Sequence, residues 1–263
     1  MRSVRGAVAA VTLGLAALAL APTASAAGTT VVDETSLTST WTTGDQRGDG
    51  ALAFVTEYGA PAGLGDGALQ LSTPGDSDKV QMLTAADLPL SALADASYWT
   101  YRVSGSGEQV PAINVVIDHN GPADGGFATL VFEPTYSYPG QVADGVWQRW
   151  DAGADASWWS TRSFPGMPSA FDSFVSLRSI IDANPDAVIE AFGVNAGSGN
   201  AGLLAAVDGL TVAGTTYDFE PRTYSKADCR DGGWASNFAA DRFVNQGDCV
   251  SYFASGGRTH AED

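Results

Sequence analysis

The chain is poor in histidine, cysteine and basic side chains. It has 2 His, 2 Cys, and 13 Lys and Arg against 30 Asp and Glu, which gives a formal net charge of −17. So acidic a protein repels phosphate backbones and anionic lipids, which argues against nucleic acid and membrane-surface partners. Neutral sugars and cations such as calcium are compatible with this charge, and so is simple extracellular solubility.

Long apolar runs are also missing, with one exception at the amino terminus. Arg2 and Arg5 precede an apolar stretch that ends at the small-residue site Ala24-Ser25-Ala26. This pattern predicts a secretory signal peptide over 1–26. The run is shorter than the roughly 20 residues that a membrane span needs. We therefore expect a secreted, extracellular protein without a membrane span.

Recognisable catalytic motifs are absent. The sequence has no H-E-x-x-H and no G-x-S-x-G, and its only histidines are His119 and His260. A Ser-His-Asp arrangement would have to use one of these two. Glu133, at an expected strand end, is a candidate glycosidase carboxylate, but no second carboxylate is identified at a suitable spacing. We assign no catalytic residue.

The two cysteines, Cys229 and Cys249, predict a disulfide. An even pair in an exported chain is typical of a disulfide. Closing a loop of this length is worth about 3 kcal/mol in the chain-entropy model. A metal site lacks partners, because neither histidine has ligand spacing to the cysteines.

The pattern of the chain predicts an all-β, jelly-roll-like antiparallel sandwich. Short apolar or alternating runs recur between Gly- and Asp-rich turns, and long amphipathic helical patterns do not occur. One short helix is expected, capped by Asp172 and ended by Asn184-Pro185. The expected strands are Thr30–Val32, Ala51–Thr56, Ala68–Ser72, Lys79–Leu83, Ser97–Val103, Ala112–Asp118, Gly126–Phe132, Gly145–Ala152, Ala156–Arg162 and two long strands within Ala187–Phe219.

The segment Gly197–Gly202 matches G-x-G-x-x-G literally. A dinucleotide site would require a long helix after it, whereas the next residues reach Asp208-Gly209 too soon. We expect a hairpin turn here and no organic cofactor.

Four segments follow from composition. They are a signal peptide over 1–26, a β-sandwich domain over 27–219, a disulfide-closed module over 220–253 and a flexible tail over 254–263. The aromatic residues of the third segment make a core too small to be stable without the disulfide.

Aromatic residues gather between Tyr136 and Trp159. Neighbours in a strand face opposite sides, so one ring of an adjacent pair points outward. An outward ring can stack on a sugar, although a sandwich core also needs tryptophan. The stacking candidates are Trp158, Trp159, Trp147, Trp150, Tyr136 and Tyr138.

Asp208 interrupts an apolar strand, and burying a lone carboxylate costs several kcal/mol. Calcium, which takes six to eight oxygens, would satisfy it. We expect Asp33, Glu34 and Asp66 as further ligands of a structural calcium. The alternative is that Asp208 begins a tight turn and faces water.

The segment 204–212, Leu-Ala-Ala-Val-Asp-Gly-Leu-Thr-Val, resembles the last strand of jelly-roll carbohydrate-binding modules. Val32-Asp33-Glu34 and Gly67-Ala68-Leu69-Gln70-Leu71 resemble that family's acidic first strand and its small-residue strand. The resemblance implies a sandwich that binds carbohydrate, often with a structural calcium. Cys-Arg-Asp-Gly-Gly-Trp (229–234) and Asn-Gln-Gly-Asp-Cys-Val-Ser-Tyr (245–252) resemble a C-terminal segment of uncharacterised secreted proteins from high-GC Gram-positive bacteria.

Together these features predict a secreted, non-enzymatic protein that binds a polysaccharide or cell-wall glycan. Two alternatives stay open. One is a glycan-cleaving enzyme, a hydrolase or lyase, on the same fold. The other is a structural or adhesive envelope protein without a small ligand.

Overall fold

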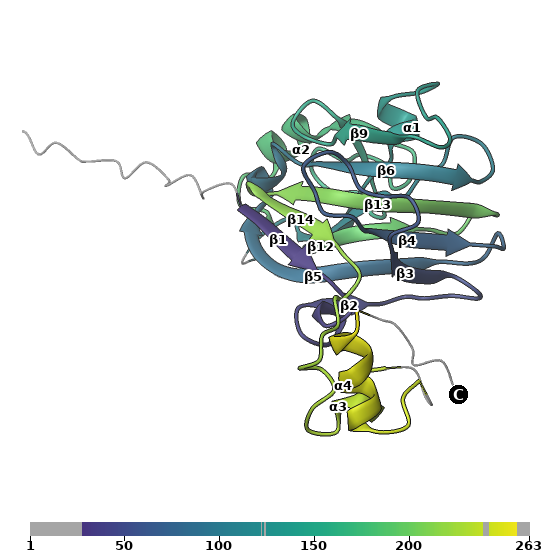
Figure 1. Ribbon diagram of the computed structural model, residues 1–263. Coiled ribbons are helices and arrows are strands. Elements are labelled where there is room, and N and C mark those ends of the chain that lie inside the picture. Colours follow the sequence, from purple (N-terminus) through teal and green to yellow (C-terminus); the bar gives the residue numbers. More distant parts are fainter. Residues whose placement is uncertain (1–27, 122, 124, 239–241, 257–263) are drawn as a thin grey trace, which may run out of the picture.

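The computed structural model describes residues 28–121, 123, 125–238 and 242–256. They form a two-sheet β-sandwich followed by a small helical module (Figure 1). The signal peptide expected over 1–26 and most of the expected tail, 257–263, lie outside these ranges. Within the ranges, no helix is both long and apolar enough to cross a membrane.

The first sheet, here called the β13 sheet, is built on a central strand with neighbours on both sides. β4 and β14 share one edge of β13, and β6 takes the other edge. The pairs are antiparallel except β1 with β14, which run parallel. Its strands are β1 (Gly28–Val32), β3 (Ala51–Val55), β4 (Ala68–Thr73), β6 (Ser97–Ser104), β9 (Trp147–Asp151), β13 (Leu203–Val212) and β14 (Thr215–Phe219).

The second sheet, the β12 sheet, is antiparallel throughout, in the order β11-β10-β8-β7-β12-β5-β2. Its strands are β2 (Trp41–Thr43), β5 (Val80–Pro89), β7 (Ala112–Asp118), β8 (Phe127–Phe132), β10 (Ser157–Ser160), β11 (Val175–Ser176) and β12 (Val188–Ala196). The short helices are η1 (Ser36–Thr38), η2 (Leu90–Leu93), α1 (Pro134–Ser137), α2 (Leu177–Ala183), α3 (Gly233–Ser236) and α4 (Gln246–Ala254).

The core lies between the two sheets and follows the period of two. In β7, Ile113, Val115 and Ile117 are fully buried and join one cluster with Leu71 and Val207 of the other sheet. Because β-branched residues suit a half-buried pleated surface, these alternating runs form strands. The predicted all-β sandwich is confirmed.

Several boundaries differ from the sequence expectation. β7 has the predicted bounds, but β5 continues to Pro89, and the short strands β2 and β11 were not predicted. The helix does not begin at Asp172. Its cap is Ser176, whose side chain accepts a hydrogen bond from the backbone N–H of Ser179, the usual way to satisfy a free N–H at a helix start.

The hairpin expected at Gly197–Gly202 is wrong. β12 belongs to one sheet and β13 to the other, so this segment carries the chain across the sandwich. The end of β4 and the turn that follows it hold this crossing segment in place. The backbone N–H of Gly199 donates to Asp76 O, and the Thr73 hydroxyl donates to Asn200 O. No helix follows, which agrees with the rejection of a dinucleotide fingerprint.

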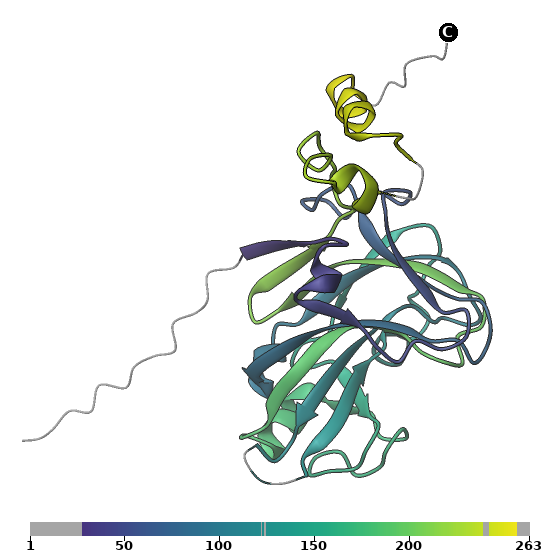
Figure 2. The same ribbon diagram turned by 90° about the horizontal axis from the view of Figure 1, so that it is seen from below.

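The C-terminal module has its own small core. Cys229 and Cys249 are bonded, with their Cα atoms 5.7 Å apart, which confirms the predicted disulfide. Both cysteines and Phe243 are buried, and Phe238 and Phe253 pack against them. The helices α3 and α4 stand apart from both sheets in Figure 2.

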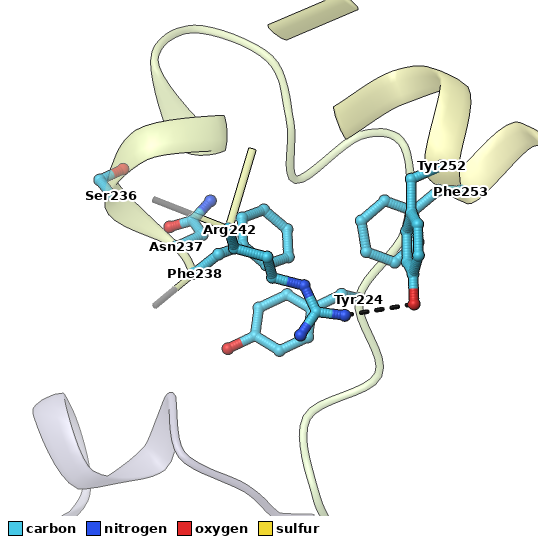
Figure 3. Close-up of a pocket in the computed structure, with 7 residues that line it drawn as sticks. All are labelled: Tyr224, Ser236, Asn237, Phe238, Arg242, Tyr252 and Phe253. Carbon is cyan, nitrogen blue, oxygen red and sulfur yellow. Dashed lines mark hydrogen bonds between the residues drawn. The ribbon is translucent and has the colours of Figure 1, made fainter. Parts of the chain in front are cut away.

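A cavity of about 450 Å³ opens in this module (Figure 3). Rings of Tyr224, Phe238, Tyr252 and Phe253 line it. Arg242 lies over the Tyr252 ring at 5.3 Å and donates to the Tyr252 hydroxyl at 3.2 Å. The Arg242 side chain is therefore already engaged by contacts within the module.

Candidate functional site

The outer face of the β12 sheet, which points away from the core, carries three amide side chains near its centre. Gln81 of β5 lies opposite Asn195 of β12. Asn114 of β7 lies opposite Gly193, one row further along. We call Gln81, Asn114 and Asn195 the amide row. Asn114 is only 7% exposed and Asn195 only 8%, although neither points into the core.

These amides are incompletely satisfied. Asn114 donates from Nδ2 to Gln81 Oε1 at 3.4 Å. No hydrogen-bond partner among the described residues reaches the buried Oδ1 atoms of Asn114 and Asn195. A buried polar atom left unpaired costs about 1–3 kcal/mol. Exchanging the O and N atoms of an amide would put an unpaired donor there instead, so either orientation leaves a buried polar group without a partner.

Gly193 lies between Asn114 and Gln81, where β12 and β5 approach closely. A Cβ at this position would lie 2.0 Å from the carbonyl oxygen of Met82 on β5, so a larger residue would clash with the neighbouring strand. The side chains of Asn114 and Gln81 meet across β12. Glycine here thus permits the close approach of the two strands beneath the amide row.

Trp159 and Glu133 lie on the same face, toward the β10 edge. Trp159 is opposite Val131, which is opposite Asn114, so two strand spacings, about 10 Å, separate Trp159 from Asn114. Trp159 donates from Nε1 to Glu133 Oε2 at 2.9 Å. Burial raises the pKa of Glu133, and this hydrogen bond from Trp159 opposes the rise. The pair offers a ring face and a planar carboxyl beside the amides.

Exposed aromatic rings border this edge of the face. Phe171 is 59% exposed and packs 5.6 Å from Trp159, and Phe174 (44%) packs 4.3 Å from Tyr136 (47%). Phe171 has φ +64°, a conformation that is uncommon for a residue other than glycine and that costs free energy. We call Tyr136, Trp159, Phe171 and Phe174 the aromatic rim.

The structure separates the six predicted stacking residues. Trp158 and Trp150 are in the core, where they donate to Ala152 O and Thr100 Oγ1, so neither can stack on a ligand. Those two assignments are wrong, because their strand positions face inward. Trp159 and Tyr136 belong to the aromatic rim. Trp147 is on the outer face of the other sheet, and Tyr138 is half-buried against Trp150.

The four expected calcium ligands do not form one set. Asp33 accepts hydrogen bonds from Thr35, and Glu34 accepts one from the backbone N–H of Arg222. Across the described ranges, no three His, Cys, Asp or Glu side chains gather closely enough to hold a metal ion. Asp208 has acidic neighbours that were not predicted, Asp218 and Glu220. The calcium remains a prediction.

Asp208 is fully buried rather than exposed in a turn. Its Oδ1 accepts hydrogen bonds from the backbone N–H groups of Gly209 and Phe219, at 2.7 and 2.8 Å. Burial raises the pKa of Asp208 from 3.8 to about 7; the two N–H groups lower it, and the carboxylates of Asp218 and Glu220 raise it further.

Sequence reasoning missed the amide row and two rim residues, Phe171 and Phe174. The signal for the amides was present: Asn114 and Asn195 each stand inside a strand between apolar residues. Alternation assigns such residues to the outer face, but it does not reveal that this part of the face is closed to solvent.

No family model matches the sequence, and no curated protein matches it significantly. Among solved structures, the family 11 carbohydrate-binding module of a Clostridium thermocellum cellulosomal cellulase matches with TM-score 0.38 at 10% identity, covering 66% of this chain and 86% of that one. The fold is similar to that of carbohydrate-binding modules. A second such module, TmCBM61 in complex with β-1,4-galactotriose, matches with TM-score 0.28 at 14% identity over 66% and 91% of the two chains. An α-L-arabinofuranosidase matches with TM-score 0.34 at 15% identity over 66% of this chain and 23% of its own. These likenesses concern the fold alone.

Proposed function

We propose that this protein is secreted and binds a neutral polysaccharide, without cleaving it, on the outer face of the β12 sheet. The observation that carries the proposal is the partly exposed indole of Trp159, which is hydrogen-bonded to Glu133, borders the exposed Phe171 ring and lies on the same face as the amide row. A sugar presents an apolar ring face that can stack on the indole and hydroxyls that can bond to the Glu133 carboxyl.

Charge supports a neutral ligand. The net charge of −17 is unfavourable for polyanions, and Glu133 adds a carboxyl on the face itself. The disulfide and the expected signal peptide are consistent with an oxidising, extracellular location. Two of the structural neighbours are described as complexes with a β-1,3-1,4-mixed-linked tetrasaccharide and with β-1,4-galactotriose, which makes these oligosaccharides sensible first probes.

A glycan array with the purified mature protein tests the proposal. We expect retention on neutral β-linked glycans and its loss in Trp159→Ala. The control is Val31→Ala, which removes an exposed apolar side chain from β1 on the other sheet. An array without any retained glycan would contradict carbohydrate binding and favour a structural or adhesive role.

The alternative function, a glycan-cleaving enzyme, is tested by a separate measurement. Glu133 is the carboxyl with a raised pKa on this face, so a cleaving enzyme would depend on it as an acid. Release of reducing ends from an array glycan, abolished in Glu133→Gln, would replace the binding proposal with a glycosidase. We expect no release.

A further inference from the structure

The outer face of the β13 sheet, on the other side of the sandwich, carries a separate pocket. It has a volume of about 310 Å³, at the small end of the range for ligand sites. Its walls include Leu64, Trp99 and Arg149, and its polar groups include Asp95, Thr211 and Thr216. None of these residues belongs to the amide row or the aromatic rim.

A backbone irregularity in β13 forms one wall of this pocket. The pairing of β13 with β6 shifts between Asp208 and Thr211. Gly209, inside this shift, has φ +58°, and a Cβ there would lie 2.8 Å from Leu64 Cδ1 and 3.0 Å from Trp99 Cδ1. The positive φ favours glycine, and the missing Cβ lets the edge of the indole lie against the strand. The buried Asp208 holds this bend by accepting from the Gly209 N–H.

Arg149 gives the pocket a strong set of donors. It lies opposite Trp99 in the pairing of β9 with β6, is exposed, and donates from Nη2 to Ser97 Oγ at 2.9 Å. Six basic residues are described between 28 and 219. Four of them pair with carboxylates, and Arg162 lies over the Phe127 ring. Arg149 does neither, so most of its five N–H donors face the pocket opening or solvent.

The chemistry of the walls identifies the ligand class. An indole, a guanidinium, a carboxylate and hydroxyl groups around a volume this small suit a compact, uncharged molecule rich in hydroxyls. Asp95 disfavours an anion, and the small volume disfavours a peptide. We infer that this pocket is a second saccharide site, which holds one sugar unit beside Trp99 with its hydroxyls bonded to Arg149. It is independent of the amide row and lies on the opposite face of the sandwich.

The indole NMR signals of Trp99 and Trp159 test the two faces in one experiment. The chain has 7 Trp, so these two signals have to be assigned. The ¹⁵N-labelled mature protein is titrated to 10 mM with a β-1,3-1,4-mixed-linked tetrasaccharide and, separately, with β-1,4-galactotriose. The indole signals of Trp99 and Trp159 are assigned from single Trp→Phe variants. We expect both signals to move with at least one probe, each with its own dependence on concentration.

The variant Arg149→Gln should remove the movement of the Trp99 signal, or weaken that binding by tenfold or more, and leave the Trp159 signal responsive. Arg178→Gln, another exposed arginine of the sandwich, is the matched control and should change neither response. Movement of the Trp159 signal without movement of the Trp99 signal at 10 mM would overturn the second site alone. Trp99 moving while Trp159 stays still would support it and count against the proposed function. If neither indole signal moves with either probe, the second site is overturned.

Discussion

The carboxylate of Asp208 joins the last two strands of the sandwich, because its Oδ1 accepts a hydrogen bond from the backbone N–H of Phe219 at 2.8 Å. Its Oδ2 is buried and has no hydrogen-bond partner within the described residues, and the carboxylates of Asp218 and Glu220 lie near enough to raise its pKa. The Oδ1 atom of Asp208 thus stabilises the fold through its hydrogen bond, while the negative charge of the same carboxylate destabilises it.

This arrangement predicts a stability that falls as the pH rises. The pKa of Asp208 is about 7 when folded, against 3.8 for the ordinary group, so the folded protein binds a proton that the unfolded chain releases. The contribution of protonated Asp208 to folding stability is fully present below about pH 4 and is lost as the pH rises through 7. Asp208→Asn keeps the acceptor without the charge. In EDTA at pH 8 it should unfold with up to roughly 4 kcal/mol more free energy than the wild type.

Thermal unfolding followed by circular dichroism at pH 4, 6 and 8 measures this difference. The gap between Asp208→Asn and the wild type should shrink as the pH falls. A variant that is less stable than the wild type by the same amount at every pH would show that the charge of Asp208 has no part in the effect.

Calcium offers a second test at the same residue. If a cation bridges Asp208 to its acidic neighbours, millimolar calcium should raise the Tm of the wild type relative to EDTA, since a ligand that binds only the folded state stabilises it. The rise should vanish in Asp208→Asn and persist in Asp182→Asn, an exposed aspartate on α2. A wild-type Tm that calcium leaves unchanged would remove the predicted site.

Sequence alone predicted the strands with strong alternation and missed features that depend on tertiary contacts. β7 was placed at its true ends because Ile113, Val115 and Ile117 alternate with other residues. β2 and β11 are too short for any pattern and exist because longer strands pair with them. The amide row was missed although Asn114 and Asn195 each interrupt an apolar strand, because alternation does not reveal how deeply an outer-face position is buried.

The disulfide should matter to the C-terminal module and not to the sandwich, because the core around Cys229 and Cys249 is separate from the main core. Replacing both cysteines by serine should cost the module about 3 kcal/mol. Hydrogen exchange should then speed up over α4 and stay unchanged over β7 and β12. Faster exchange in those two strands would show that the module supports the sandwich.

Adjacent tryptophans of β10 should respond oppositely to truncation. Trp158→Ala empties a fully buried position and should cost about 3–5 kcal/mol of stability. Trp159→Ala removes a partly exposed ring and should change the free energy of unfolding much less, while abolishing glycan retention. Urea denaturation compares the two variants. Equal losses of stability would contradict the assignment of Trp159 to a ligand face.

The most direct test is Gln81→Ala, with stability and glycan affinity measured on the same sample. Gln81 is the partly exposed member of the amide row, so a ligand on this face can reach its amide. The variant loses one long hydrogen bond, from Asn114 at 3.4 Å, so its Tm should change little. Titration calorimetry with the glycan that the array retains best should show at least tenfold weaker binding, about 1.4 kcal/mol. A lower Tm with unchanged affinity would make Gln81 a structural residue and contradict glycan binding on this face.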